Sequence, residues 1–154
     1  MARTKLIENL NKALSLELSG VIQYTQHSFL VTGIEREVYR EFFRALAREA
    51  HDHVEIWGDK LVALGGIPTV EPAMIRQSTD LQEMLEQGLE LERDAMKAYK
   101  AAWSACNEEE ELATKFLLEE QIAEEQKHIE ELEKLTSERR ANAGKERIVL
   151  RQIS

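Results

Sequence analysis

The stretch GGIPTVEPAMIRQST, residues 65–79, decides how the rest of the chain folds. It contains both prolines of the chain, Pro68 and Pro72, and two of its seven glycines. Proline interrupts helices, so the segments on either side are free to form long helices of their own. Fifteen extended residues reach roughly 50 Å, and a helix of 28 residues is ~42 Å long. The stretch can therefore run back along a whole helix, which makes the helices before and after it parallel.

Four segments outside this stretch carry apolar residues at steps of three and four, the spacing of one helix face. The predicted helices cover about residues 4–31, 36–64, 80–106 and 109–137. Short breaks around Gly33 and Asn107 make the first and second helices, and the third and fourth, antiparallel neighbours. The sequence therefore predicts an all-α, antiparallel four-helix bundle with one long crossover between helices two and three.

The C-terminal end differs in composition from the bundle. We expect residues 1–138 to form the bundle and residues 139–154 to form a basic tail or short helix. The apolar run of this tail, residues 148–150, could dock on the core or on a neighbouring subunit. The chain shows no repeat, although the first two helices resemble the last two in general plan.

Composition limits the class of protein. The chain has 154 residues, of which 43% are hydrophobic and 32% charged, enough for one core with a solvated surface. A net charge of −9 disfavours nonspecific nucleic-acid binding. The single cysteine, Cys106, excludes an intrachain disulfide and agrees with a reducing compartment. No signal peptide and no membrane-spanning run is expected, so the predicted location is the cytoplasm.

Five residues of metal-ligand type occupy seam positions near the middles of the predicted helices. They are Glu17, His53, Glu92, Glu125 and His128. Helix middles lie at one level in a bundle, so these side chains should meet in the core. Buried carboxylates repel one another and lose solvation, and a pair of divalent cations would remove both problems. Carboxylate with imidazole suits iron, manganese or zinc.

The spacing within the fourth helix supports this interpretation. Glu125 and His128 form a Glu-x-x-His pair, which diiron bundles use twice, together with one lone glutamate from each of the other two helices. Glu17 and Glu92 would be the lone glutamates, and helix two should carry the second pair. Each residue alone has an ordinary explanation as a solvated acid or a hydrogen-bonded core histidine. The convergence of all four helices on one level favours the metal site.

Several segments resemble the bacterioferritin family, and together they cover almost the whole chain up to about residue 135. The segment LSLELSGVIQY, residues 14–24, resembles its first-helix signature. Residues 53–68 resemble the end of its second helix and the start of its crossover, and residues 89–92 and 125–130 resemble its third and fourth ligand segments.

The resemblance implies a ferritin-like shell of 24 identical subunits. Each subunit would oxidise ferrous iron with dioxygen or peroxide at a diiron centre, and the ferric product would mineralise inside. It implies that Glu125 bridges two irons, that Glu17 and Glu92 are terminal ligands, and that His53 and His128 each hold one iron. Tyr24, one heptad after Glu17, matches a tyrosine of the signature and joins the candidate catalytic residues.

Two positions depart from the family pattern. Ungapped alignment of residues 53–68 puts Ala50 where the family has its second bridging glutamate. Glu49 is adjacent and could partly substitute; a register shifted by one residue would instead pair Glu49 with Asp52. His51 stands where the family has the methionine that binds haem b between two subunits. Imidazole is also an axial haem ligand, although a solvated surface histidine is the simpler interpretation.

These departures leave other functions open. Ala50 motivates a structural shell subunit with a weak or silent centre. Another dimetal enzyme on the same bundle, such as a rubrerythrin-like peroxidase or a manganese catalase, is a further alternative. One cysteine cannot build the rubredoxin module of rubrerythrins proper. A DNA-protecting miniferritin would place its metal site at a subunit interface rather than on this seam.

Overall fold

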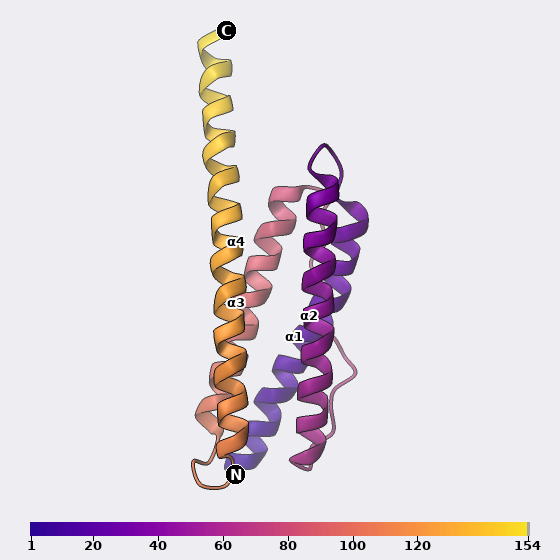
Figure 1. Cartoon of the computed structure of the whole chain (residues 1–154), viewed down its shortest axis with the longest axis vertical. Coiled ribbons are helices and arrows are strands. Elements are labelled where there is room, and N and C mark those ends of the chain that lie inside the picture. The colour runs from indigo at the N-terminus through magenta and orange to yellow at the C-terminus, as the bar shows by residue number, and fades with distance from the viewer. Residues whose placement is uncertain (154) are drawn as a thin grey trace.

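The computed structural model is a bundle of four helices, with no strand in residues 1–153 (Figure 1). The helices are α1 (Ala2–Leu30), α2 (Arg36–Ala63), α3 (Leu81–Ala105) and α4 (Leu112–Ile153). The structure describes the backbone of residues 1–153 and the side chains of residues 1–137 and 145. Helix α1 packs closely against α2 and α3, and α3 packs against α4. The predicted all-α bundle is confirmed, and α2 and α3 run in the same direction (Figure 1).

The crossover between α2 and α3 lies along α1, which holds it through residues spaced four apart. This spacing places them on one face of the helix, one turn after another. The contacts join Asn11 Oδ1 to the Thr69 N–H at 2.8 Å, the Ser15 carbonyl to the Ala73 N–H at 2.8 Å, Ser19 Oγ to the Met74 carbonyl at 3.1 Å, and Gln23 Oε1 to the Arg76 N–H at 3.0 Å. The backbone of the extended crossover thus finds the hydrogen-bond partners that a helix would otherwise supply.

Both ends of the crossover carry recognisable capping residues. Gly65, directly after the C-cap Leu64, has φ +86°, a left-handed conformation that glycine adopts without a steric penalty. Asp80 is the N-cap of α3, and its carboxylate accepts the backbone N–H of Glu83 at 2.9 Å. These two residues fix where α2 ends and where α3 begins.

Helix α4 is longer than the sequence pattern predicts. It continues as one helix to Ile153 and extends beyond the other three helices (Figure 1). The segment RRANAGK, residues 139–145, contains no proline, and its single Gly144 costs a helix only about 1 kcal/mol. The loss of apolar periodicity near residue 137 marks the end of the bundle rather than the end of the helix. The division of the chain after residue 138 stays a prediction, and the side chains of residues 148–150 lie outside the described residues.

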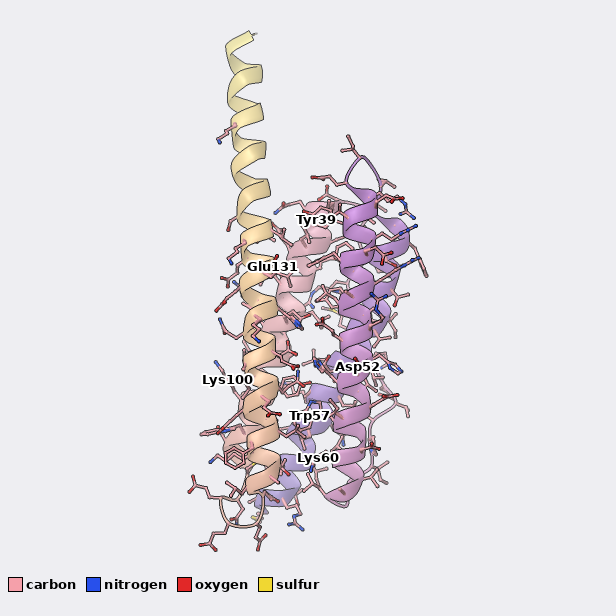
Figure 2. The ribbon with its side chains drawn as sticks, in the orientation of Figure 1. Tyr39, Asp52, Trp57, Lys60, Lys100 and Glu131 are labelled. Carbon is pink, nitrogen blue, oxygen red and sulfur yellow. The ribbon has the colours of Figure 1, made fainter. Side chains whose placement is uncertain are left out.

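Aromatic side chains fill the middle of the core. Trp57, Tyr24, Tyr99 and Phe43 are almost completely buried, and the Trp57 side chain lies between α2 and α4 (Figure 2). The rings of Trp57 and Tyr99 have centroids 5.5 Å apart. No described helix has a stretch long and apolar enough to cross a membrane.

His27 gives the fold an acid-sensitive position. Its side chain is fully buried against Phe43, with ring centroids 5.2 Å apart, and neither ring nitrogen has a hydrogen-bond partner among the described atoms. Burial disfavours the charged imidazolium and lowers the pKa of His27 from 6.5 to about 4.

We expect this histidine to make the protein less stable in acid. The unfolded chain takes up the proton near pH 6.5 and the folded chain only near pH 4, so stability is lost as the pH falls between these values. The loss is up to about 3 kcal/mol at 1.36 kcal/mol per pKa unit. Urea unfolding of wild type and His27→Gln across this range measures it, and the variant should show the shallower decline. Parallel pH profiles would contradict the assignment.

Candidate metal centre

Five side chains of metal-ligand type meet in the middle of the bundle. Ligand atoms of Glu17, His53 and Glu125 lie within 4.8 Å of one another, and so do those of Glu92, Glu125 and His128. Every helix contributes, and Glu125 on α4 belongs to both groups. All five positions that the sequence pattern singles out are therefore brought together.

Two buried atoms in this cluster have no hydrogen-bond partner. One is Glu125 Oε2 and the other is His128 Nδ1. Leaving such atoms unpartnered costs about 1–3 kcal/mol each. Both have a lone pair that a cation can accept, in a ring of carboxylate oxygens and imidazole nitrogens. The donor set fits a pair of iron, manganese or zinc ions.

Two tyrosines hold the lone glutamates. The Tyr24 hydroxyl on α1 donates to Glu92 on α3, and the Tyr99 hydroxyl on α3 donates to Glu17 on α1. Burial raises the pKa of both tyrosines well above 10, and the neighbouring carboxylates raise it further. The hydroxyls thus remain donors and leave the other carboxylate oxygens free to bind a cation.

A chain of hydrogen bonds orients Glu125. The Trp57 indole donates to Gln121 Oε1 at 3.2 Å, and Gln121 Nε2 donates to Glu125 Oε1 at 3.0 Å. The same amide nitrogen lies 3.2 Å from both ring nitrogens of His53. One oxygen of Glu125 is thus fixed by α2 and α4 together, and the other oxygen is the one without a partner.

The carboxyl groups of the centre hold unequal charge. Burial raises the pKa of Glu125, and the neighbouring Glu92 raises it further. Burial would also raise the pKa of Glu92, but its close contacts with Glu125 and His128 outweigh it and lower that pKa. Two like charges this close share one proton, so Glu92 carries the charge while Glu125 keeps the proton.

The histidines take up positive charge from their surroundings. Burial would lower the pKa of His128, but the neighbouring carboxylates of Glu49 and Glu92 outweigh it and raise the pKa to about 10. His53 follows the same pattern, since contacts with Glu17 and Glu124 outweigh its burial and raise its pKa. A divalent cation bound at the centre would replace the inner protons of these rings.

Position 50 contributes no ligand. Ala50 and His53 are buried while Asp52 is exposed, which agrees with the ungapped register. Ala50 faces α1 at Gly20, where an added Cβ would lie 3.3 Å from the Cβ of Ala50. Glu49 does not take its place, because its carboxylate contacts the outer nitrogen of His128, with Oε2 at 2.5 Å from Nε2.

His51 lies on the opposite side of α2 from His53, as their spacing predicts. It is exposed and forms a 4.0 Å ion pair with Glu55. His51, Asp52 and Glu55 form an exposed group whose ligand atoms lie within 4.8 Å of one another.

A solvent-exposed pocket of about 460 Å³ adjoins the centre between α2 and α4. Asp52, which is labelled in Figure 2, lies at its rim. Its lining consists of Glu49, Asp52, His53, Ile56, Glu124, Lys127 and His128. The pocket brings solvent to the outer side of both histidines.

Sequence reasoning missed Tyr99, Gln121 and Glu124. Tyr99 and Gln121 fit the apolar face of their helices, and Glu124 stands in a strongly acidic helix. A numerical signal was nevertheless present. Glu17 and Glu92, Tyr24 and Tyr99, Glu49 and Glu124, and His53 and His128 are each separated by 75 residues. This constant separation identifies Tyr99 and Glu124 as counterparts of Tyr24 and Glu49.

Comparison with known proteins agrees with this geometry. Residues 7–141 match the family model of the ferritin-like domain. A bacterioferritin of Brucella melitensis is 35% identical over 134 residues, which cover 84% of this chain and 81% of that protein.

Solved structures agree as well. A ferritin-like diiron-carboxylate protein of Bacillus anthracis superposes with a TM-score of 0.85 at 32% identity, over 88% of this chain and 98% of that one. A bacterioferritin of Rhodobacter capsulatus, described with a metal-free dinuclear site and a haem iron, superposes with a TM-score of 0.78 at 29% identity, over 87% and 84%. On these matches the chain belongs to the ferritin-like family and is a relative of the bacterioferritins.

Proposed function

We propose that this protein oxidises ferrous iron at the four-helix centre and stores the ferric product inside a shell of identical subunits. The observation that carries the proposal is Glu125, whose carboxylate belongs to two ligand groups that each add one glutamate and one histidine. Two ferrous ions held side by side can deliver two electrons together to dioxygen or peroxide. Iron is the substrate in this scheme.

The residues around the centre have defined tasks in this reaction. Glu17 and His53 would hold one ion and Glu92 and His128 the other, with Glu125 between them. Tyr24 and Tyr99 orient the terminal carboxylates. The pocket between α2 and α4 connects the centre with solvent, so ferrous ions reach the histidines without passing through the apolar core.

Exposed apolar side chains support assembly into a shell. Ile22 and Phe29 on α1, Val38 and Val62 on α2, and Val70 on the crossover are 46–89% exposed. Contiguous apolar patches mark surfaces that another protein covers, and side chains such as these would be buried between subunits of a shell. We propose a homo-oligomer, with 24 subunits as the expected size, in the cytoplasm. Native mass measurement tests the subunit number.

Iron-soaked crystals and stopped-flow kinetics test the proposed reaction. Anomalous scattering should show two iron positions, each within bonding distance of one histidine and Glu125. Oxygen should then be consumed when ferrous iron is added. Crystals without iron at these side chains would refute the proposal.

Two alternative functions predict different reactions from the proposed one. Ala50 favours a slow or silent shell subunit, which would bind two ions but show no rapid oxidation. Another dimetal enzyme, such as a peroxidase, would consume peroxide catalytically without accumulating a ferric core. A DNA-protecting role finds less support, because all five ligand positions lie within one subunit.

We also propose His51 as an axial ligand of haem b at a two-fold interface. A two-fold axis places the same residue of two subunits opposite each other, and His51 faces outward from α2. Haem reconstitution of wild type and His51→Ala tests this. Wild type should give a low-spin bis-histidine spectrum with a lower potential than methionine ligation gives. Equal uptake by both proteins, or uptake by neither, would rule out the axial role.

A further inference from the structure

Each histidine of the centre has one ring nitrogen facing inward and one facing outward. His53 Nδ1 lies 3.3 Å from Glu17 Oε1 and 3.8 Å from Glu125 Oε1, and His128 Nδ1 lies 3.8 Å from Glu92 Oε2. The outer nitrogens meet different carboxylates. His53 Nε2 lies 3.2 Å from Glu124 Oε2, and His128 Nε2 lies 2.5 Å from Glu49 Oε2.

The two outer contacts are reciprocal. Glu49 and His53 are on α2, and Glu124 and His128 are on α4, so each helix uses its glutamate to hold the histidine of the other. In both helices the glutamate precedes the histidine by four residues, a spacing that puts both side chains on the same face one turn apart. Helices α2 and α4 are not among the closely packed pairs, which are α1–α2, α3–α4 and α1–α3. The two outer contacts therefore join a pair of helices that has few other close contacts.

We propose that Glu49 and Glu124 are positioning residues that keep the Nδ1 atoms of His128 and His53 available to the two metal ions. This inference rests on the proposed function. A neutral imidazole carries one proton, and a hydrogen bond at one nitrogen decides which nitrogen keeps it. When a cation has replaced the inner proton, a carboxylate at Nε2 holds the remaining proton there, and the Nδ1 lone pair is directed at the ion. Gln121 near His53 is a donor and does not compete with Glu124 for this proton.

The role separates these glutamates from the ligands. Glu49 and Glu124 have half-exposed side chains at the rim of the solvent pocket, whereas Glu17, Glu92 and Glu125 are buried. Neither belongs to a buried ligand group. Outer carboxylates that orient a metal-bound histidine typically change metal affinity 10- to 100-fold.

Cobalt(II) titration of the full-length protein tests the proposal, read from visible absorption and calorimetry. Wild type should bind two equivalents. Glu124→Leu should weaken the equivalent held by His53 by about 10- to 100-fold and leave the other tight. Glu49→Leu should do the same to the equivalent held by His128, and the double variant should weaken both.

Matched variants separate positioning from simple loss of charge. In Glu124→Gln and Glu49→Gln an amide oxygen can still accept the Nε2 proton, so these proteins should retain most of the affinity. Glu120→Gln removes an exposed negative charge from α4 outside the ligand groups, and it should bind cobalt as wild type does. Equal losses in the Leu and Gln variants would overturn the positioning role in favour of simple charge.

The controls also distinguish failure of this inference from failure of the proposed function. Two tight equivalents in wild type and unchanged binding in both Leu variants would overturn the inference and leave the metal centre intact. No tight cobalt binding in wild type would overturn both. Native mass and circular dichroism identify any variant that has lost its fold; for a Leu variant that has, Glu124→Ala or Glu49→Ala takes its place with the same expected loss.

Discussion

Glu125→Gln should remove paired metal binding while leaving the bundle folded. Glu125 is the only residue shared by the two buried ligand groups of the described chain. An amide oxygen is a much poorer ligand for a divalent cation than a carboxylate. Loss of an outer partner alone costs about 10- to 100-fold in affinity, so loss of the shared ligand should cost at least about 100-fold. Calorimetry with cobalt(II) and stopped-flow oxidation of ferrous iron should both show the loss.

The fold should survive because glutamine resembles the protonated form of this residue. Burial and the neighbouring Glu92 raise the pKa of Glu125, which favours the neutral carboxyl before a cation binds. The hydrogen bond from Gln121 can be kept by the amide oxygen. Glu120→Gln, an exposed change on the same helix, is the matched control. Two tight equivalents in Glu125→Gln would show that the ions do not share this residue.

The fold could be predicted from the sequence because its main determinants are local. Apolar steps of three and four predict the helices, and the length of residues 65–79 predicts the crossover. The end of α4 could not be predicted in this way. Apolar periodicity reports burial rather than helix, and α4 continues to Ile153 after its contact with the bundle has ended.

The candidate centre was predictable where a residue type is out of place in a core. Glu17, Glu92 and Glu125 are carboxylates at buried positions, which needs an explanation from the sequence alone. Tyr99 and Gln121 are ordinary in a core, and only the three-dimensional contacts reveal what they hold. Which atoms Glu49 contacts depends on the distance between α2 and α4, which only the tertiary structure gives. Sequence proximity to Ala50 suggested a substitute ligand, whereas the structure places Glu49 at the outer nitrogen of His128.

The separation of 75 residues also shows where the two halves of the centre differ. The counterpart of Glu125 is Ala50, one turn before His53 just as Glu125 is one turn before His128. The counterpart of Ala95, which is buried on α3, is Gly20 on α1. Gly20 is smaller than Ala95, and it belongs to the half formed by α1 and α2, which has Ala50 where the other half has Glu125.

Ala50→Glu should strengthen the centre and accelerate iron oxidation. The new carboxylate would enter from α2 on the face of His53, opposite Glu125, and give the pair of ions a second shared ligand. An added interaction of about 1.4 kcal/mol is a ten-fold change in affinity, and we expect at least this for cobalt(II) at both equivalents. Ferrous oxidation, measured by stopped flow, should be faster than in wild type because the second bridge holds the two ions together.

The same change should destabilise the protein before metal binds. A fourth carboxyl would join three buried ones, and an unpaired buried charge costs several kcal/mol unless its pKa shifts. Ala50→Gln has nearly the same volume without the charge, so it measures the steric cost alone. Ala50→Glu should therefore unfold at lower temperature than Ala50→Gln without metal and at higher temperature with cobalt(II) bound, because binding to the folded state adds stability. If Ala50→Glu bound two ions but oxidised iron no faster than wild type, one shared carboxylate would be sufficient for the reaction.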